Sequence, residues 1–207
     1  MAAPSAVADW REDQRQSILH GLQAVLMCNG LFTSHRSLDA VFAQELAFLR
    51  PPRFEPALGT ASEGPYRIDR LRKSVTVGTE TPRSAVSAVF RDGFGCIVLP
   101  PGQLPTDEVL GSLPEAPKVE ENQSFSEETW PYGDQVTILQ SETVDAVALK
   151  AAGDWAFNRE TPEQVTTSLL ITRQNAMVYE RYAPGFNAQT RQRTWSVAKS
   201  IAATLIG

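Results

Sequence analysis

The sequence is poor in the residues that build metal centres. Its 207 residues include two cysteines, Cys28 and Cys96, and two histidines, His20 and His35. A structural zinc site needs four such ligands close together. We therefore expect no metal and no other cofactor. The two cysteines are either buried thiols or a single disulfide, since sequence alone does not bring them within bonding distance.

Positive charge and long apolar runs are scarce as well. The net charge is −5, from 19 Lys and Arg against 24 Asp and Glu. Nucleic-acid binding needs a basic surface, so we expect no nucleic-acid partner. The apolar run after Arg11 is interrupted by His20, Gln23 and Asn29, which predicts neither a signal peptide nor a membrane segment. These features make the cytoplasm the default location, with an upstream export segment left open.

What the sequence does contain is typical of a globular protein with two parts. Hydrophobic residues make up 42% and charged residues 21%. Residues 100–132 are rich in Pro, Glu, Ser and Gly, a composition typical of an extended connection. We place an N-terminal extension at 1–135 and a second domain at 136–207.

The N-terminal extension is predicted to contain two helices and several short strands. Apolar spacing favours helices over 11–28 and 37–49, with Ser37 as the N-cap of the second. Asn29-Gly30 is expected to end the first helix, followed by an extended piece at 31–33. The β-prone stretches are 74–77, 85–90 and 96–99.

The second domain is predicted to run helix, strand, turn, strand, loop, helix. Apolar residues from Val144 to Trp155 recur at helical spacing. Residues 166–172 and 177–182 are expected to pair as a hairpin around a turn at 174–176. The chain as a whole is therefore expected to be an α+β protein.

The last predicted helix begins with a Ser-x-x-Lys pattern, Ser196 to Lys199. Residues three apart share one helix face, so the lysine amine is expected beside the serine hydroxyl, where it can activate a nucleophile. Free backbone N–H groups at a helix start suit a developing oxyanion. The alternative is a capping serine followed by a solvated lysine. The apolar residues 201–206 predict a buried helix, in which a lysine without a role is costly.

Three segments together resemble a known family. Residues 169–173, 178–185 and 195–200 resemble the β-lactamase-related serine hydrolases, most closely the branch of 6-aminohexanoate-dimer hydrolase and class C β-lactamase. Residues 28–32 and 90–96 are similar to an N-terminal extension of some members. The resemblance implies part of a β-lactamase/transpeptidase-like fold, in which an antiparallel sheet is covered by helices.

The resemblance also implies a chemistry. Ser196 matches the nucleophile that becomes acylated, and Lys199 matches the partner that keeps its proton mobile; the substrate is a small-molecule ester or amide, β-lactams included. The family's later Tyr-x-Asn and Lys-Thr-Gly elements have no counterpart after Lys199. We therefore expect the N-terminal portion of a hydrolase that requires the remainder of its catalytic domain and is inactive alone. Two alternatives stay open: a non-catalytic interaction or regulatory protein that retains half the fold, and a penicillin-binding protein.

Overall fold

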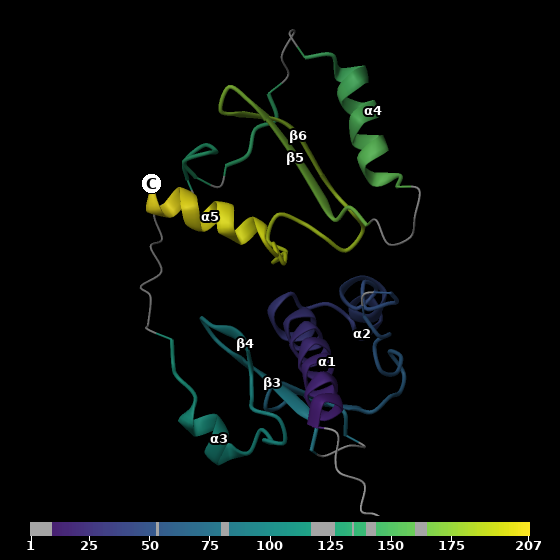
Figure 1. Ribbon diagram of the computed structural model, residues 1–207. Coiled ribbons are helices and arrows are strands. Elements are labelled where there is room, and N and C mark those ends of the chain that lie inside the picture. The colour runs from purple at the N-terminus through teal and green to yellow at the C-terminus, as the bar shows by residue number, and fades with distance from the viewer. Residues whose placement is uncertain are drawn as a thin grey trace, which may run out of the picture. The chain divides into compact units, whose positions relative to one another are not determined.

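The chain folds into two compact units. The computed structural model describes residues 10–52, 54–79, 83–116, 127–133, 135–139, 144–159 and 165–207. We call the units the N-terminal unit (Met1–Lys118) and the C-terminal unit (Val119–Gly207). Each combines helices with an antiparallel sheet (Figure 1), so the chain is an α+β protein, as predicted. None of the helices in the described ranges is long and apolar enough to cross a membrane.

The N-terminal unit contains an antiparallel sheet of four strands in sequence order. The strands are β1 (Tyr66–Asp69), β2 (Ser74–Val77), β3 (Val86–Arg91) and β4 (Gly95–Val98). The last three confirm the strands predicted at 74–77, 85–90 and 96–99. β1 is not predicted from the sequence because two of its four residues are charged; pairing with β2 places it in the sheet.

The two faces of this sheet differ in chemistry. Side chains alternate between the faces of a strand. One face is apolar and belongs to the hydrophobic core; it includes Val75, Val77 and Ala88. The opposite face carries buried hydroxyls, from Ser74, Thr76 and Ser87. Because Thr76 and Ser87 are cross-strand partners, their hydroxyls can bond, and they do so at 2.8 Å.

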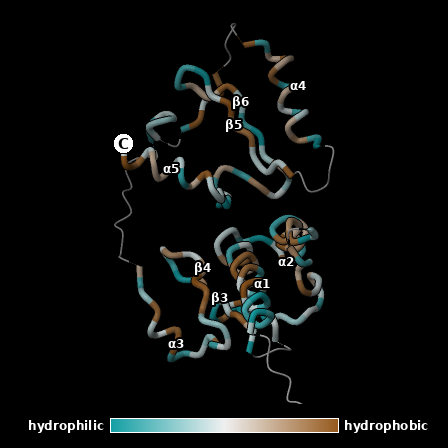
Figure 2. Tube along the Cα trace, in the orientation of Figure 1, coloured by the Kyte–Doolittle hydropathy of each residue, from teal (hydrophilic) through white to brown (hydrophobic). Residues whose placement is uncertain are grey.

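Helix α1 (Trp10–Cys28) covers the apolar face (Figure 1). Its hydrophobic residues, brown in Figure 2, include Ala24, Met27 and Cys28, all of them fully buried. Gly21 faces the sheet, where a Cβ would lie 3.5 Å from Val86, an ordinary contact distance. Burial of this side of α1 supplies the main apolar stabilisation of the unit.

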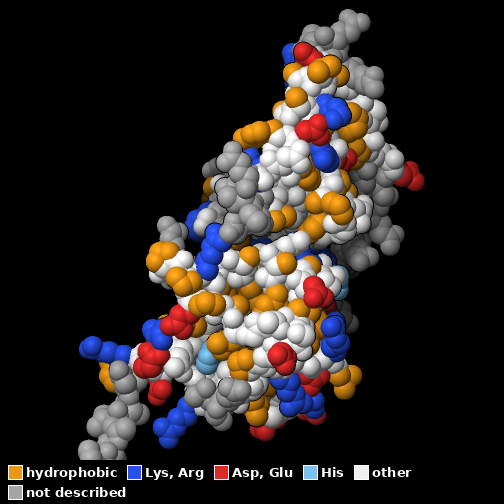
Figure 3. Space-filling model, turned by 90° about the vertical axis from the view of Figure 1, so that its right-hand side faces the viewer, with side chains coloured by type: hydrophobic (Ala, Val, Ile, Leu, Met, Phe, Trp, Pro, Cys, Tyr) orange, Lys and Arg blue, Asp and Glu red, His pale blue; other side chains and the backbone are white. Residues whose placement is uncertain are grey.

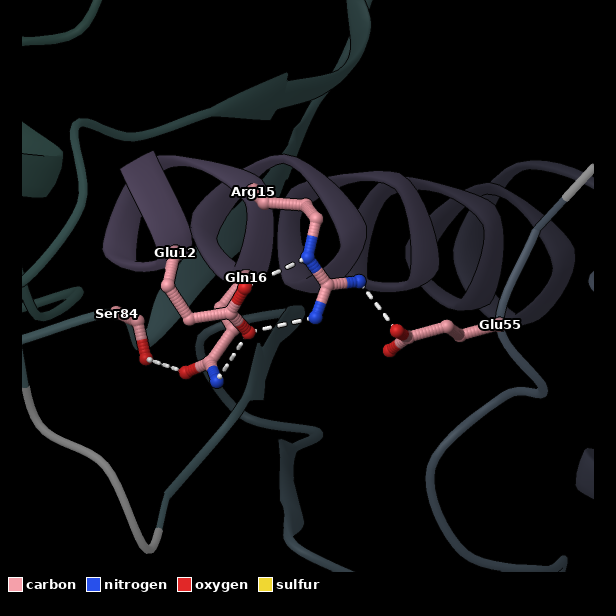
Figure 4. Close-up of polar contacts among 5 residues, drawn as sticks. All are labelled: Glu12, Arg15, Gln16, Glu55 and Ser84. Atoms are coloured by element: carbon pink, nitrogen blue, oxygen red, sulfur yellow. Dashed lines mark hydrogen bonds and ion pairs between the residues drawn. The ribbon is translucent and has the colours of Figure 1, made fainter. Parts of the chain in front are cut away.

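A polar network fixes the first half of α1 to two loops (Figure 4). Arg15 donates hydrogen bonds to Glu12 on the same helix and to Glu55 on the loop that follows α2. Gln16 donates to Glu12 at 3.1 Å and accepts from the Ser84 hydroxyl at 3.4 Å. The bonds from Arg15, and then from Gln16, lower the pKa of Glu12.

The α-helix ends at Cys28, as predicted. The extended piece predicted at 31–33 is wrong, because the chain continues as a π-helical turn over Asn29–Thr33. The physical reason is packing: a Cβ on Gly30 would lie 2.6 Å from Val41, so the glycine permits contact with the next helical segment. The glycine is needed here for close approach rather than for a left-handed backbone.

The predicted second helix is shorter and irregular. It begins as α2 (Leu38–Ala40), capped as predicted by Ser37, whose hydroxyl accepts from the Ala40 N–H at 3.2 Å. It then continues as a π-helix over Val41–Glu45. The apolar residues recur with the α-helical period of 3.6 residues, which does not indicate the wider turn of a π-helix. The sequence therefore predicts one regular helix.

A disulfide joins α1 to the sheet. Cys28 at the end of α1 is bonded to Cys96 in β4, with 6.1 Å between the Cα atoms. The two cysteines therefore form a disulfide, which is one of the two alternatives that the sequence leaves open, and are not buried thiols. Disulfides persist mainly in oxidising compartments, so the bond favours such a compartment over the cytoplasm.

The C-terminal unit is built on the predicted hairpin. Strands β5 (Ser168–Arg173) and β6 (Ala176–Tyr182) pair antiparallel. Gln174 and Asn175 form the turn with φ of 49° and 60°, both positive as a type I′ hairpin turn requires. The segment before α4 runs beside β6, where the Leu139 N–H donates to the Met177 carbonyl at 2.8 Å. The hairpin is therefore the centre of this unit.

Helix α4 (Ala146–Phe157) packs on β6 through a glycine. Asp145 caps the helix by accepting from Val147 and Ala148. A Cβ on Gly153 would lie 2.1 Å from the Tyr179 hydroxyl oxygen, so a larger residue would force the Tyr179 side chain to move. Beside it, Arg181 pairs with Asp154 at 2.8 Å. These contacts fix the helix to the strand that leads toward Ser196.

The disulfide predicts a redox-dependent stability of the N-terminal unit. The bridge spans 68 residues of sequence, so its reduction is expected to lower the free energy of unfolding by about 2–4 kcal/mol through the freedom gained by the unfolded chain. Urea unfolding with and without dithiothreitol measures this. A Cys28→Ala/Cys96→Ala variant is the control and should not respond to dithiothreitol. Equal stability of the oxidised and reduced wild-type chains would contradict the prediction.

The α4–β6 contact predicts that Gly153→Ala destabilises the C-terminal unit by about 1–3 kcal/mol, because the new methyl group collides with Tyr179. Faster amide hydrogen exchange in α4 is the measurement. The control is Gly111→Ala in helix α3 (Asp107–Ser112), where nothing lies within 4 Å of the added Cβ. Unchanged exchange in the Gly153 variant would argue that α4 is held by other contacts.

Candidate functional site

Ser196 lies at the start of helix α5 (Val197–Ile206), the last element of the C-terminal unit (Figure 1). It occupies the N-cap position, with φ −68° and ψ −11°, but its side chain makes no capping hydrogen bond. A serine at this position usually accepts from the backbone N–H of the second or third helical residue. The hydroxyl of Ser196 is therefore not used as a cap.

The hydroxyl of Ser196 contacts Lys199 instead. The Nζ atom of Lys199 donates to Oγ at a distance of 3.2 Å. The two side chains meet because residues three apart lie on one face of a helix. The structure thus brings the two residues singled out by the sequence into direct contact.

The residue before Ser196 has an unusual backbone. Trp195 has φ of +48°, a left-handed conformation that is rare for a bulky residue and costs free energy. The residue is 58% exposed, and the centre of its ring lies 5.3 Å from the guanidinium carbon of Arg193. Backbone strain of this kind is concentrated at functional sites. Nothing in the sequence signals it, since tryptophan is not a residue that favours positive φ.

The backbone around Ser196 offers one N–H group to a ligand. The N–H groups of Val197, Ala198 and Lys199 donate to carbonyls three residues earlier, at 3.0–3.1 Å. The N–H of Ser196 makes no hydrogen bond to another residue in the described ranges. It is therefore free to bind an oxygen that develops negative charge next to Oγ.

The tyrosines nearest in sequence are engaged in the hairpin. Tyr179 packs against Gly153, and its hydroxyl and then Asp154 raise the pKa of Arg181. Tyr182 donates its hydroxyl hydrogen to Glu180, and this bond, with burial, raises the pKa of Tyr182 to about 12. A phenol that holds its proton so firmly is a poor general base at neutral pH.

The surroundings of Ser196 differ from the predicted buried helix. Ser196, Lys199 and all of α5 are exposed. The exposed side chains include Val197, Ile201, Leu205 and Ile206. The upper part of Figure 3, which is the C-terminal unit, shows hydrophobic side chains at the surface. In the described part of the unit, the apolar helix α5 is therefore exposed to solvent. The Ser196–Lys199 pair is exposed with it.

The described residues do not complete a catalytic site around Ser196. Within the described ranges, no third side chain is hydrogen-bonded to Oγ or to Nζ. No group of three Asp, Glu, His or Cys residues there could hold a metal ion. What the geometry offers is a hydroxyl, an amine in contact with it and one backbone donor.

Comparisons of the chain with protein-family models, curated proteins and solved structures found no match.

The environment of Tyr182 predicts its titration. A raised pKa means that the phenol keeps its proton to higher pH than a free tyrosine, whose pKa is about 10. We expect Tyr182 to titrate near pH 12 and Glu180→Gln to lower its pKa, because the acceptor loses its negative charge. Carbon NMR of ring-labelled tyrosine, assigned with Tyr182→Phe, is the measurement. A pKa that does not respond to Glu180→Gln would show that Glu180 is not the cause.

Proposed function

We propose that the protein is a serine hydrolase that cleaves an ester or amide bond through an acyl-enzyme on Ser196. The observation that carries the proposal is the contact between Lys199 Nζ and Ser196 Oγ at 3.2 Å, made by a serine hydroxyl that does not cap its helix. The strained backbone of Trp195 and the free N–H of Ser196 support it. A serine that only began a helix would need none of these features.

The proposed reaction uses Lys199 as the proton carrier. In its neutral form, Lys199 takes the proton from Ser196 Oγ as this oxygen attacks the carbonyl carbon. The carbonyl oxygen becomes an oxyanion beside the N–H of Ser196. When the carbon–oxygen or carbon–nitrogen bond breaks, Lys199 passes the proton to the leaving alcohol or amine. Water then adds to the acyl-enzyme, releases a carboxylic acid and returns the proton to Ser196.

The proposal includes a fold and a substrate class. We assign the C-terminal unit to a β-lactamase/transpeptidase-like fold, on the order of hairpin, loop and Ser-x-x-Lys helix. In such a site a second oxyanion donor and a further general base face the serine. We assign both roles to residues outside the described ranges. Small esters and amides, β-lactams among them, are the proposed substrates.

A fluorophosphonate probe tests the nucleophile directly. We expect the intact protein, with its complete catalytic domain, to be labelled at Ser196 and Ser196→Ala to abolish labelling. Lys199→Ala should slow labelling by about 100-fold or more, because the hydroxyl loses its proton acceptor. The measurement is the rate of labelling by mass spectrometry, with the modified residue identified in a peptide digest.

The matched control is Ser200→Ala, one residue after Lys199 and also exposed. It should be labelled at the wild-type rate. Labelling that survives Ser196→Ala, or none in the wild type, would overturn the proposal, and the second result would favour a non-catalytic interaction protein. A parallel incubation with labelled penicillin distinguishes the penicillin-binding alternative, which requires a stable acyl group on Ser196.

A further inference from the structure

The N-terminal unit contains a cavity on the face of the sheet that is turned away from α1. Its volume is about 560 Å³, within the range of small-molecule sites. The floor is the hydroxyl-bearing face of β1 and β2, and a wall is formed by Gly102 and residues 104–107, where the chain enters α3. The Gly102 N–H donates to the Ala85 carbonyl at 2.8 Å, which fixes this wall to the sheet.

Ser74 projects a buried hydroxyl into this cavity. The residue is 2% exposed and lines the cavity. Its hydroxyl makes no hydrogen bond to another residue in the part of the chain that the structure describes. Thr76, two residues further along the same face, differs because its hydroxyl bonds to Ser87 at 2.8 Å. Because Ser74 lines the cavity and its hydroxyl has no partner among the described residues, the hydroxyl can donate to a ligand bound there.

The cavity is lined by two arginines and two aspartates, whose charges balance. Arg72 donates to Asp107 at 2.9 Å and to Asp69 at 3.2 Å, so these three side chains satisfy one another. Arg67 lines the same cavity from β1, directly across from Thr76 in the pairing register. Among the described residues it has no ion-pair partner. Its guanidinium is available for one anionic group.

The remaining lining is apolar, from Ala85, Leu104 and Pro105. From these features we propose that the cavity binds a small monocarboxylate with an apolar chain. Arg67 holds the carboxylate, for which a guanidinium has matching paired donors, and Ser74 donates to it. Asp69 and Asp107 disfavour a dianion such as a phosphate monoester, because like charges repel in the same cavity.

Isothermal titration of the full chain with straight-chain monocarboxylates from butanoate to decanoate tests the proposal. We expect binding in this series, with octanoate binding more tightly than octanamide and octyl phosphate. Arg67→Gln should weaken the binding by about tenfold or more through loss of the charged pair. Ser74→Ala should weaken it by less, and Arg67→Lys should give an intermediate loss, because the charge remains without the paired donors.

The matched control is Arg70→Gln, which removes the same charge from an exposed residue of the same hairpin outside the cavity. It should bind within about twofold of the wild type. Ser196→Ala should also bind normally, since the cavity lies in the other unit; this separates the result from the hydrolase proposal. No binding across the series, equal binding of octanamide, or an equal loss in Arg67→Gln and Arg70→Gln would overturn the proposal.

Discussion

Burial of α1 against one face of the sheet is the interaction on which the N-terminal unit depends. Ala24, Met27 and Cys28 are fully buried there, and the disulfide to Cys96 fixes the end of the helix where it meets β4. Because strands alternate their side chains, an apolar face toward α1 leaves Ser74 and Thr76 on the other side. The cavity is thus a consequence of the packing that stabilises the fold. One face of the sheet packs in the hydrophobic core, and the opposite face carries the hydroxyl groups that line the cavity.

The C-terminal unit depends on its hairpin in the same way. α4 rests on β6 through Gly153, and the chain leaves β6 at Tyr182 to reach Ser196 fourteen residues later, by the numbering of the sequence. The positive φ of Trp195 turns the backbone directly before α5. Ser196 itself has helical dihedral angles rather than those of a capping residue, and its hydroxyl contacts Lys199 instead of the first turn of its own helix. Strand, strained turn and helix therefore act together to present one hydroxyl.

Most of the correct predictions come from the spacing of residues that are close together in the sequence. The hairpin follows from two β-prone runs around Gln174-Asn175, and the closeness of Ser196 and Lys199 follows from helix geometry alone. Features that depend on distant partners are missed or left open. The π-helical turn over Asn29–Thr33 is missed because the contact of Gly30 with Val41 is not visible in the sequence. The Cys28–Cys96 bond spans 68 residues, and the cavity beside Ser74 requires β1, β2 and the segment before α3 to be in place.

Ser196 and Lys199 are in contact but exposed to solvent, whereas the proposed chemistry requires them to be shielded from water. A lysine accepts a proton from serine only in its neutral form, which desolvation favours and water opposes. Lys199 shares α5 with the exposed apolar side chains of Val197, Ile201 and Leu205. Anything that covers this helix removes water from the apolar side chains and from the amine together. The hydrophobic effect that would bury α5 therefore also favours the protonation state that the proposed chemistry requires, so packing and activation of Ser196 are coupled through one helix.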